Sequence, residues 1–340
     1  GSKEHNVRMR QRALDMGLRL NEFGLFPLEG LGDAKGLQAA ENGLPAFDEE
    51  EIYGHLKMKW VPPEMREDMG EIEASLSGTL PSLIEPVHVK GALHNHTTAS
   101  DGSGSLIEMA DAAIDLGWEF LGIADHSEIL NIGGRSIGVP QDKVVQQGNE
   151  IREMNYEWEE EDTNFRLLHG SECDILADGK LDYPDSIRRE FSHVVGSVHA
   201  IGSWRNRDEI ENTEILIKAI EDPTFTILGH PTGRIIGGRE GFPLDLHAVL
   251  RRMGELNEEG ILKACEINAS PYRLDLDWRL CKFAKSQGVP IVINPDAHST
   301  KGLKDVWFGV QMARKGWLEE ADVLNCLPGS VIEERMMEGK

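Results

Sequence analysis

Short apolar runs typical of β-strands recur from about residue 88 onward and alternate with segments of helical character. Seven such runs are present, at residues 89–96, 120–126, 166–175, 193–200, 225–230, 264–269 and 289–298. Helical patterns lie between them at residues 105–117, 211–222, 245–260 and 278–288, and the first has Ser105 and Glu108 at capping-box spacing. Alternating strands and helices predict parallel strands joined by crossover helices, hence an α/β fold. We expect a barrel, because seven strands suit a barrel better than a six-stranded open sheet.

Residue types that bind metals lie at or near the ends of six of these seven runs, or in the loop that follows. They are His94, His96, Asp101, His126, Glu172, His199, His230, Asp296 and His298. Because the carboxyl ends of parallel barrel strands meet at one rim, we expect these side chains to converge there. Mixed imidazole and carboxylate ligands suit Zn²⁺, Mn²⁺ or Fe²⁺. Nine ligands exceed what one ion can use, so the pattern predicts two or three ions.

Such a centre predicts phosphoester hydrolysis. Adjacent metals can deprotonate a bridging water at neutral pH and stabilise the attacking and leaving oxygens of a phosphoryl displacement. We expect Glu172, Asp101 and His126 to act in catalysis through a metal-activated hydroxide. Each motif alone has a structural interpretation, since a single HxH pair or the GHP turn at 229–231 is common without a metal. Their joint placement at the strand ends favours the metal site.

Charge and cysteine content narrow the setting. The net charge of −24 argues against broad, sequence-independent adhesion to nucleic acid. The widely spaced Cys173, Cys265, Cys281 and Cys326 form no CxxC pair, which favours a reducing, intracellular environment. No apolar run approaches the roughly 20 residues of a membrane span, and no secretion signal is visible. We therefore expect a cytoplasmic location without a membrane partner. The opening Gly1 suggests a fragment of a longer chain.

The series HNH…D, DH, E, VHA, GHP and PDAH resembles the PHP (polymerase and histidinol phosphatase) domain over about residues 88–335. All nine positions of that family's ligand pattern are filled. The resemblance implies a distorted (β/α)7 barrel with a trinuclear metal centre. It assigns His94, His96, Glu172 and Asp296 to one metal, with Glu172 bridging to a second metal that His199 and His230 also hold. Asp101, His126 and His298 are assigned to the third metal.

Residues 1–70 form a separate small module, and residues 71–87 are expected to be a linker. The stretches GSKEHNVRMR (1–10), RLNEFGLFPL (19–28) and EEEIYGHLKMKWVPPEMRE (49–67) resemble the thumb of a family X DNA polymerase, a small α+β piece. The resemblance implies that Asn6 and Arg10 contact the incoming nucleotide and the nascent base pair. A basic helix at 8–19 could face phosphates. The catalytic palm is absent from these residues, so an upstream palm and fingers are the expected partners.

The order thumb, linker, PHP domain resembles bacterial family X polymerases. It implies a Mn²⁺-dependent 3′→5′ exonuclease, with 3′-phosphatase or abasic-site activity, that acts on gapped or single-stranded DNA in repair. Zn²⁺ or Fe²⁺ are alternative ions. Arg135, Arg234 and Arg239 are candidate contacts to the substrate phosphate, and Tyr272 is a candidate for base stacking. Two alternatives stay open: a phosphomonoesterase of the histidinol phosphatase kind, and a non-catalytic module that supports an upstream polymerase.

Overall fold

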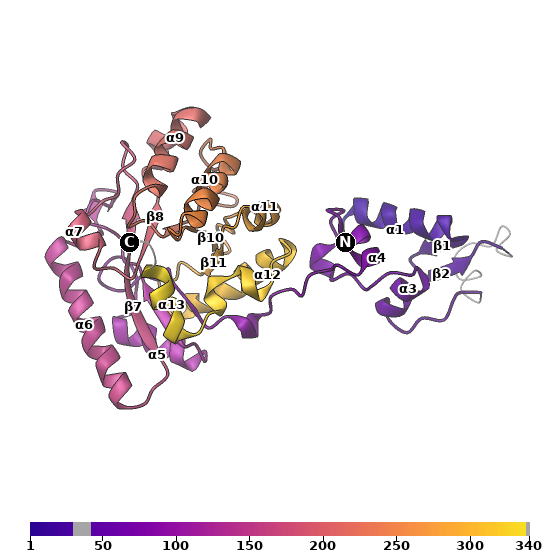
Figure 1. Ribbon diagram of the computed structural model, residues 1–340, viewed down its shortest axis with the longest axis horizontal. Coiled ribbons are helices and arrows are strands. Elements are labelled where there is room, and N and C mark those ends of the chain that lie inside the picture. The colour runs from indigo at the N-terminus through magenta and orange to yellow at the C-terminus, as the bar shows by residue number, and fades with distance from the viewer. Residues whose placement is uncertain (30–41, 338–340) are drawn as a thin grey trace. The chain divides into compact units, whose positions relative to one another are not determined.

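The structure is a computed structural model that describes residues 1–29 and 42–337 (Figure 1). The chain divides into two compact units, Gly1–Ser82 and Leu83–Lys340. The first unit contains helices α1 (Lys3–Asp15), α3 (Glu49–His55) and α4 (Glu71–Ser77) and the antiparallel strands β1 (Leu18–Asn21) and β2 (Gly24–Pro27). Helix α4 therefore lies within the stretch for which the sequence predicts a linker.

Helix α1 begins and ends earlier than the basic helix expected at 8–19. The Ser2 side chain accepts a hydrogen bond from the His5 backbone N–H and starts the helix at Lys3. Gly17, with a φ of 73°, follows the last turn. Residues 18–21 then pair with residues 24–27 as a hairpin that buries Leu25 and Phe26. The hairpin removes the end of the predicted helix.

The second unit is built on seven parallel strands in the order β11-β10-β9-β8-β7-β4-β3. Their bounds are β3 Gly91–Ala92, β4 Phe120–Ile123, β7 Arg166–Asp174, β8 His193–Ser197, β9 Ile227–Leu228, β10 Ala264–Asn268 and β11 Ile291–Asn294. A parallel bridge between Asn95 and Ala297, with the His96 N–H donating to the Ala297 carbonyl at 2.9 Å, joins the two edges. The sheet is thus a nearly closed barrel, which confirms the predicted α/β class.

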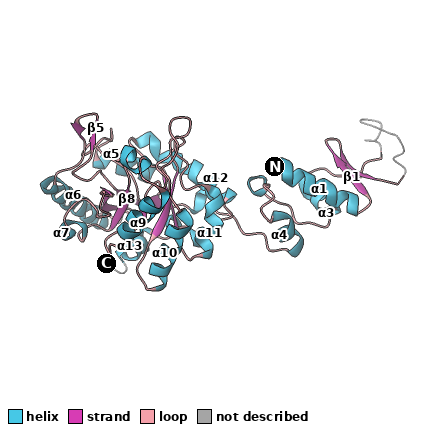
Figure 2. Ribbon diagram, turned by 90° about the horizontal axis from the view of Figure 1, so that it is seen from above, coloured by secondary structure: helices cyan, strands magenta, loops and turns pink. Residues whose placement is uncertain are grey.

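Helices surround this barrel (Figure 2). They are α5 Leu106–Asp115, α6 Gln141–Glu160, α7 Asp185–Arg188, α8 Ile201–Arg205, α9 Glu209–Ile220, α10 Leu246–Glu258, α11 Cys281–Ser286, α12 Val306–Lys315 and α13 Gly329–Met337. A short hairpin of β5 (Asn131–Ile132) and β6 (Arg135–Ser136) extends one loop. Helix α5 has the predicted capping box of Ser105 and Glu108. Helices α6, α7, α8, α12 and α13 lie outside the four segments for which the sequence predicts a helix.

Apolar side chains fill the interior of the barrel. Inside the barrel, Leu168, Val195 and Val292 from three strands pack together. Ile332 and Met336 of α13 are fully buried in the same cluster. Glu333 of α13 pairs at 2.8 Å with Arg166, the first residue of β7, so α13 covers the end of the barrel opposite the strands' carboxyl ends. Among the described residues, no helix is both long and apolar enough to cross a bilayer.

Candidate metal centre

The nine predicted ligand residues come together at the carboxyl ends of the barrel strands. His94 and His96 follow β3, His126 follows β4, and Glu172 lies within β7. His199 and His230 follow β8 and β9, and Asp296 and His298 follow β11. A parallel bridge between His126 and Glu172 and the bridge beside His96 continue the strand pairing up to the ligands. Backbone pairing therefore brings side chains up to about 200 residues apart into one cluster.

Glu172 is the centre of this cluster. Its Oε1 lies 2.9 Å from His230 Nε2 and 3.2 Å from His199 Nε2. Its Oε2 lies 2.8 Å from His126 Nδ1, 3.4 Å from His94 Nε2 and 3.6 Å from His96 Nε2. One buried carboxylate therefore faces five imidazoles, with different rings on its two oxygens. Such a carboxylate can bridge two metal ions.

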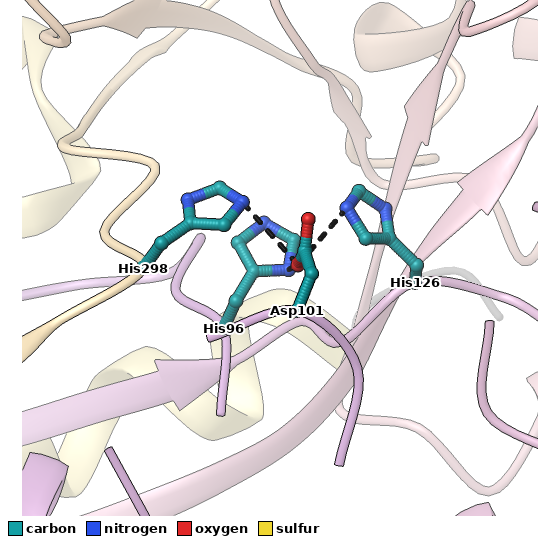
Figure 3. A group of neighbouring side chains, drawn as sticks. All are labelled: His96, Asp101, His126 and His298. Carbon is teal, nitrogen blue, oxygen red and sulfur yellow. Dashed lines mark ion pairs between the residues drawn. The ribbon is translucent and has the colours of Figure 1, made fainter. Parts of the chain in front are cut away.

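Asp101 organises a second group, shown in Figure 3. Its Oδ1 lies 3.3 Å from His298 Nε2, 3.4 Å from His126 Nε2 and 3.8 Å from His96 Nδ1. The carboxylate reaches this position from the loop between β3 and α5. That loop is held at the Ser103 N–H, which donates to the His298 carbonyl at 2.8 Å. A carboxylate and three imidazoles thus converge at this second place in the cluster.

The unpaired ring nitrogens show that these residues fit metal ions. His94 Nε2, His96 Nδ1 and His126 Nδ1 are buried and face carboxylates of the cluster, but none of them makes a hydrogen bond of acceptable geometry among the described residues. Leaving a buried polar atom unpaired costs about 1–3 kcal/mol. Within each of three groups, the candidate ligand atoms lie within 4.8 Å of one another: His96–Asp101–His126–His298, His94–His96–Glu172 and His126–Glu172–His199. Divalent ions bound to these groups would satisfy the unpaired nitrogens.

The same crowding shifts the pKa values in opposite directions. Burial alone would raise the pKa of Glu172, but His199, His94 and His126 outweigh it and hold the pKa well below its ordinary value. Burial would lower the pKa of His126, but Glu172 and Asp101 raise it to about 9. Burial together with His126 lowers the pKa of His96 to about 4. The carboxylates therefore stay ionised and available as metal ligands at neutral pH.

Family comparisons agree with this geometry. A model of the PHP domain matches residues 92–268, and a model of the DNA polymerase beta thumb matches residues 1–67. The chain belongs to the PHP domain family. The predicted resemblance to a family X polymerase is also confirmed, because the chain is 39% identical over 325 residues to the DNA polymerase/3′-5′ exonuclease PolX of Bacillus subtilis. That alignment covers 96% of this chain and 52% of the relative, so the chain spans about half the relative's length.

Other similar proteins are described as phosphatases. A probable phosphatase of Clostridium acetobutylicum is 26% identical over 209 residues, which is 61% of this chain and 78% of the relative. A solved histidinol phosphate phosphatase from Lactococcus lactis, complexed with zinc, L-histidinol and phosphate, has a TM-score of 0.46 at 17% identity. That comparison covers 66% of this chain and 93% of the solved one.

Two buried carboxylates of the PHP barrel contact the Nδ1 atoms of ligand imidazoles. Sequence reasoning missed both of them. Glu266 Oε2 lies 2.7 Å from His94 Nδ1, and Asp174 Oδ1 lies 2.9 Å from His199 Nδ1. In each ring the second nitrogen, Nε2, faces Glu172. The signals are present in the sequence: Asp174 is two residues after Glu172 on the same strand face, and Glu266 interrupts an apolar run.

The predicted phosphate-binding arginines of the PHP barrel lie in different environments. Arg234 is bound to its own loop, because its Nε donates to the Arg273 carbonyl at 2.9 Å and its Nη2 to the Leu274 carbonyl. Arg239 Nε donates to the Gly233 carbonyl, and Arg135 is exposed on β6. Tyr272 is 72% exposed. Their contacts with substrate stay predictions.

Arg273, which sequence reasoning did not single out, lies closer to the centre. Its Nε is 3.5 Å from Asp296 Oδ2. Its Nη1 is buried without a hydrogen-bond partner among the described residues.

The unit Gly1–Ser82, which contains the thumb match, is called the thumb unit below. In this unit, Asn6 Nδ2 donates to the Ser2 carbonyl at 2.9 Å, and Arg10 is exposed on α1. The nucleotide contacts expected of Asn6 and Arg10 also stay predictions.

Proposed function

We propose that the PHP barrel hydrolyses DNA phosphodiesters and removes nucleotides from 3′ ends as part of a family X DNA polymerase. The observation that carries the proposal is the buried Glu172 carboxylate facing five histidines, because such a cluster fits two or three divalent ions. The thumb match in residues 1–67 and the printed description of the Bacillus relative support DNA as the substrate. Mn²⁺ as the activating ion and a role in repair belong to this proposal.

The chain's own residues supply ligands, orientation and charge. In the proposed arrangement the nine rim residues hold the ions in three neighbouring groups, two of which share Glu172. Bound divalent ions would supply a nucleophile at neutral pH and stabilise charge on the phosphoryl oxygens. Glu266 and Asp174 fix the rotation of His94 and His199. Arg273 offers a guanidinium beside Asp296, where it could pair with a phosphate oxygen.

The second candidate is phosphomonoester hydrolysis. It is favoured by relatives described as probable phosphatases, which are 26–28% identical over about three fifths of this chain. The same metal centre would serve both reactions. A 3′-phosphatase or abasic-site activity would combine them on DNA.

The test is digestion of a 3′-end-labelled single strand by the full chain in Mn²⁺, run beside phosphate release from histidinol phosphate. We expect nucleotides to be released from the DNA and the Glu172→Ala variant to be inactive. The matched control is Glu153→Ala, which removes an exposed carboxylate on α6 and should leave the activity unchanged. Activity on the monoester alone would overturn the nuclease proposal, and activity on neither substrate would favour a non-catalytic module.

A further inference from the structure

A stripe of basic and aromatic side chains follows the ligand His298 along the chain. The 3₁₀-helix Thr300–Asp305 (η4) continues directly into α12, and Lys301, Lys304, Trp307 and Phe308 are exposed along the two. Side chains at i and i+3 eclipse one another in a 3₁₀-helix, so Lys301 and Lys304 project from one face. Trp307 and Phe308 continue that face at i+3 and i+4 from Lys304. We call these four residues the η4–α12 stripe.

The stripe stands on a rigid support. Leu303, Val310 and Ala313, on the opposite side of the same two helices, are fully buried. Gly309 lies so close to Ile293 of β11 and Ala269 after β10 that a Cβ there would collide with both. Trp307 remains 51% and Phe308 38% exposed, with their ring centroids 5.2 Å apart. Two large aromatic rings held open on a packed helix indicate a binding surface.

The charge around the stripe is opposite to that of the chain. Residues 299–308 contain two basic residues, Lys301 and Lys304, and one acidic residue, Asp305, whereas the whole chain has a net charge of −24. Within the described ranges, neither Lys301 nor Lys304 forms an ion pair with a carboxylate. The exposed aromatic of helix α6, Tyr156, instead lies close in sequence to Glu153, Glu157 and Glu159. The stripe therefore complements a polyanion that also carries aromatic rings.

The stripe also begins at the metal centre. Lys301 is three residues beyond His298, whose ring faces Asp101. Leu303 of η4 is buried in one cluster with Met109 and Ala110 of α5, the helix that follows the Asp101 loop. At about 2 Å per residue, η4 spans about 12 Å. A nucleic-acid strand that leaves the centre along η4 would meet Lys301 first, then Lys304 and Trp307.

We propose that the η4–α12 stripe binds single-stranded DNA next to the scissile 3′ end. Lys301 and Lys304 neutralise backbone phosphates, and Trp307 stacks on a base a few nucleotides from the centre. The occupant is a single strand, because a base must be free of its duplex partner to stack on an exposed ring. This inference rests on the proposed nuclease function, which it deepens by naming the surface that receives the strand.

The first test measures binding of a fluorescein-labelled oligothymidylate to the metal-free full chain by anisotropy, over a range of salt concentrations. We expect Trp307→Ala to weaken binding about tenfold, within the range for loss of one stacked base. The Lys301→Ala/Lys304→Ala variant should lower the slope of log K against log salt by about 1.4, the value for two phosphate contacts on a single strand. The matched controls Tyr156→Ala and Lys180→Ala/Lys218→Ala should bind like the unmodified chain.

A second readout locates the contact, because the thumb unit can also hold DNA. An oligonucleotide with 5-iododeoxyuridine near its 3′ end should photocrosslink to the peptide that contains Trp307. Crosslinks found only elsewhere, or unchanged affinity of Trp307→Ala, would overturn the proposal. Unchanged DNA binding together with a Trp307-dependent change in sedimentation would assign the stripe to a protein partner and overturn it equally.

Hydrolysis of bis(p-nitrophenyl) phosphate in Mn²⁺ separates this inference from the proposed function. This small diester needs the metal centre and does not reach the stripe, so Trp307→Ala should cleave it at the unmodified rate. An equal loss of cleavage rate by Trp307→Ala on the small diester and on DNA would show damage to the metal centre and would overturn the proposal for the stripe. If the unmodified chain cleaves neither substrate while its DNA affinity depends on Trp307, the nuclease proposal fails and the binding surface stands.

Discussion

Among the described residues, each unit of this chain holds a buried cluster of histidine and carboxylate, and the two clusters differ in whether their polar atoms are hydrogen-bonded. In the thumb unit, both ring nitrogens of His5 are bonded, Nδ1 to Glu71 Oε1 at 2.6 Å and Nε2 to Tyr53 Oη at 3.2 Å. Glu71 also accepts the backbone N–H groups of Asp68 and Met69. At the barrel rim, three histidines each keep a buried ring nitrogen without a hydrogen-bond partner in the described parts of the chain.

The difference separates a structural role from a binding role. A closed network has nothing to gain from a ligand, since each buried atom already has its partner. An open network of imidazoles and ionised carboxylates costs free energy until a cation joins it. Burial and residue type are alike in the two clusters, so they alone do not identify a metal site. What distinguishes the two clusters is whether their buried donor and acceptor atoms are hydrogen-bonded.

Removal of metal should affect the two units differently, and this is the largest effect we expect. Treatment with EDTA should lower the free energy of unfolding of the barrel by about 4 kcal/mol relative to metal at a thousand times its Kd. Peptides from residues 1–82 should keep their protection. Hydrogen exchange with mass spectrometry on the full chain measures both. Equal loss of protection in the two units would contradict the distinction.

Removing Glu71 from the hydrogen-bonded network around His5 should lower the stability of the thumb unit nearly as much as metal removal lowers that of the barrel. Glu71→Ala removes the partner of His5 Nδ1 and of two backbone N–H groups, so the thumb unit should lose about 3 kcal/mol of stability. The matched control Glu73→Ala removes an exposed carboxylate from the same helix and should change stability by less than about 0.5 kcal/mol. Metal content should stay constant in both variants. A drop in metal content of Glu71→Ala would show that the two clusters are coupled.

The orienting role of Glu266 should show as a smaller change in metal affinity. Its Oε2 fixes His94 Nδ1, and its Oε1 accepts from the Asn268 side chain at 2.9 Å. Glu266→Gln should weaken metal binding about 10- to 100-fold while the circular dichroism spectrum stays the same. Competition with a chelating dye measures the affinity, with the exposed Glu258→Gln as control. Equal affinities in the two variants would leave Glu266 a packing role only.

Acid should weaken the thumb unit through Glu71, with the smallest effect of the four. Burial would raise the pKa of Glu71, but its hydrogen bonds to His5 and to backbone N–H groups hold the pKa below the ordinary value of 4.5. Below that value the unfolded chain takes up a proton that the folded unit does not. Stability should therefore fall with falling pH, by at most about 1.4 kcal/mol per pH unit. Denaturant titrations from pH 6 downward should show a flatter profile for Glu71→Gln, and parallel profiles would exclude this carboxylate as the cause.

The barrel and its rim could be predicted from the sequence because an apolar strand run and a ligand-type residue lie next to each other in the chain. Most of the ligands follow an apolar run, as His126 follows 120–125, so their place at the rim depends only on local pattern and parallel pairing. The partners of Glu266 and Glu71 could not be predicted in this way. His94 is 172 residues from Glu266, and His5 is 66 from Glu71, and no periodicity links residues so far apart. The environment of Arg234 could not be predicted for a similar reason, since the loop carbonyls that accept from its guanidinium come next to it only in the folded chain.

Elemental analysis of the purified full chain and of its Glu172→Ala variant tests most directly whether the histidine–carboxylate cluster at the barrel rim binds metal. The account predicts two or three divalent transition-metal ions per chain and a clear loss of metal in the variant, because Glu172 faces five of the six ligand histidines. Less than one ion per chain, or the same content in both proteins, would contradict it.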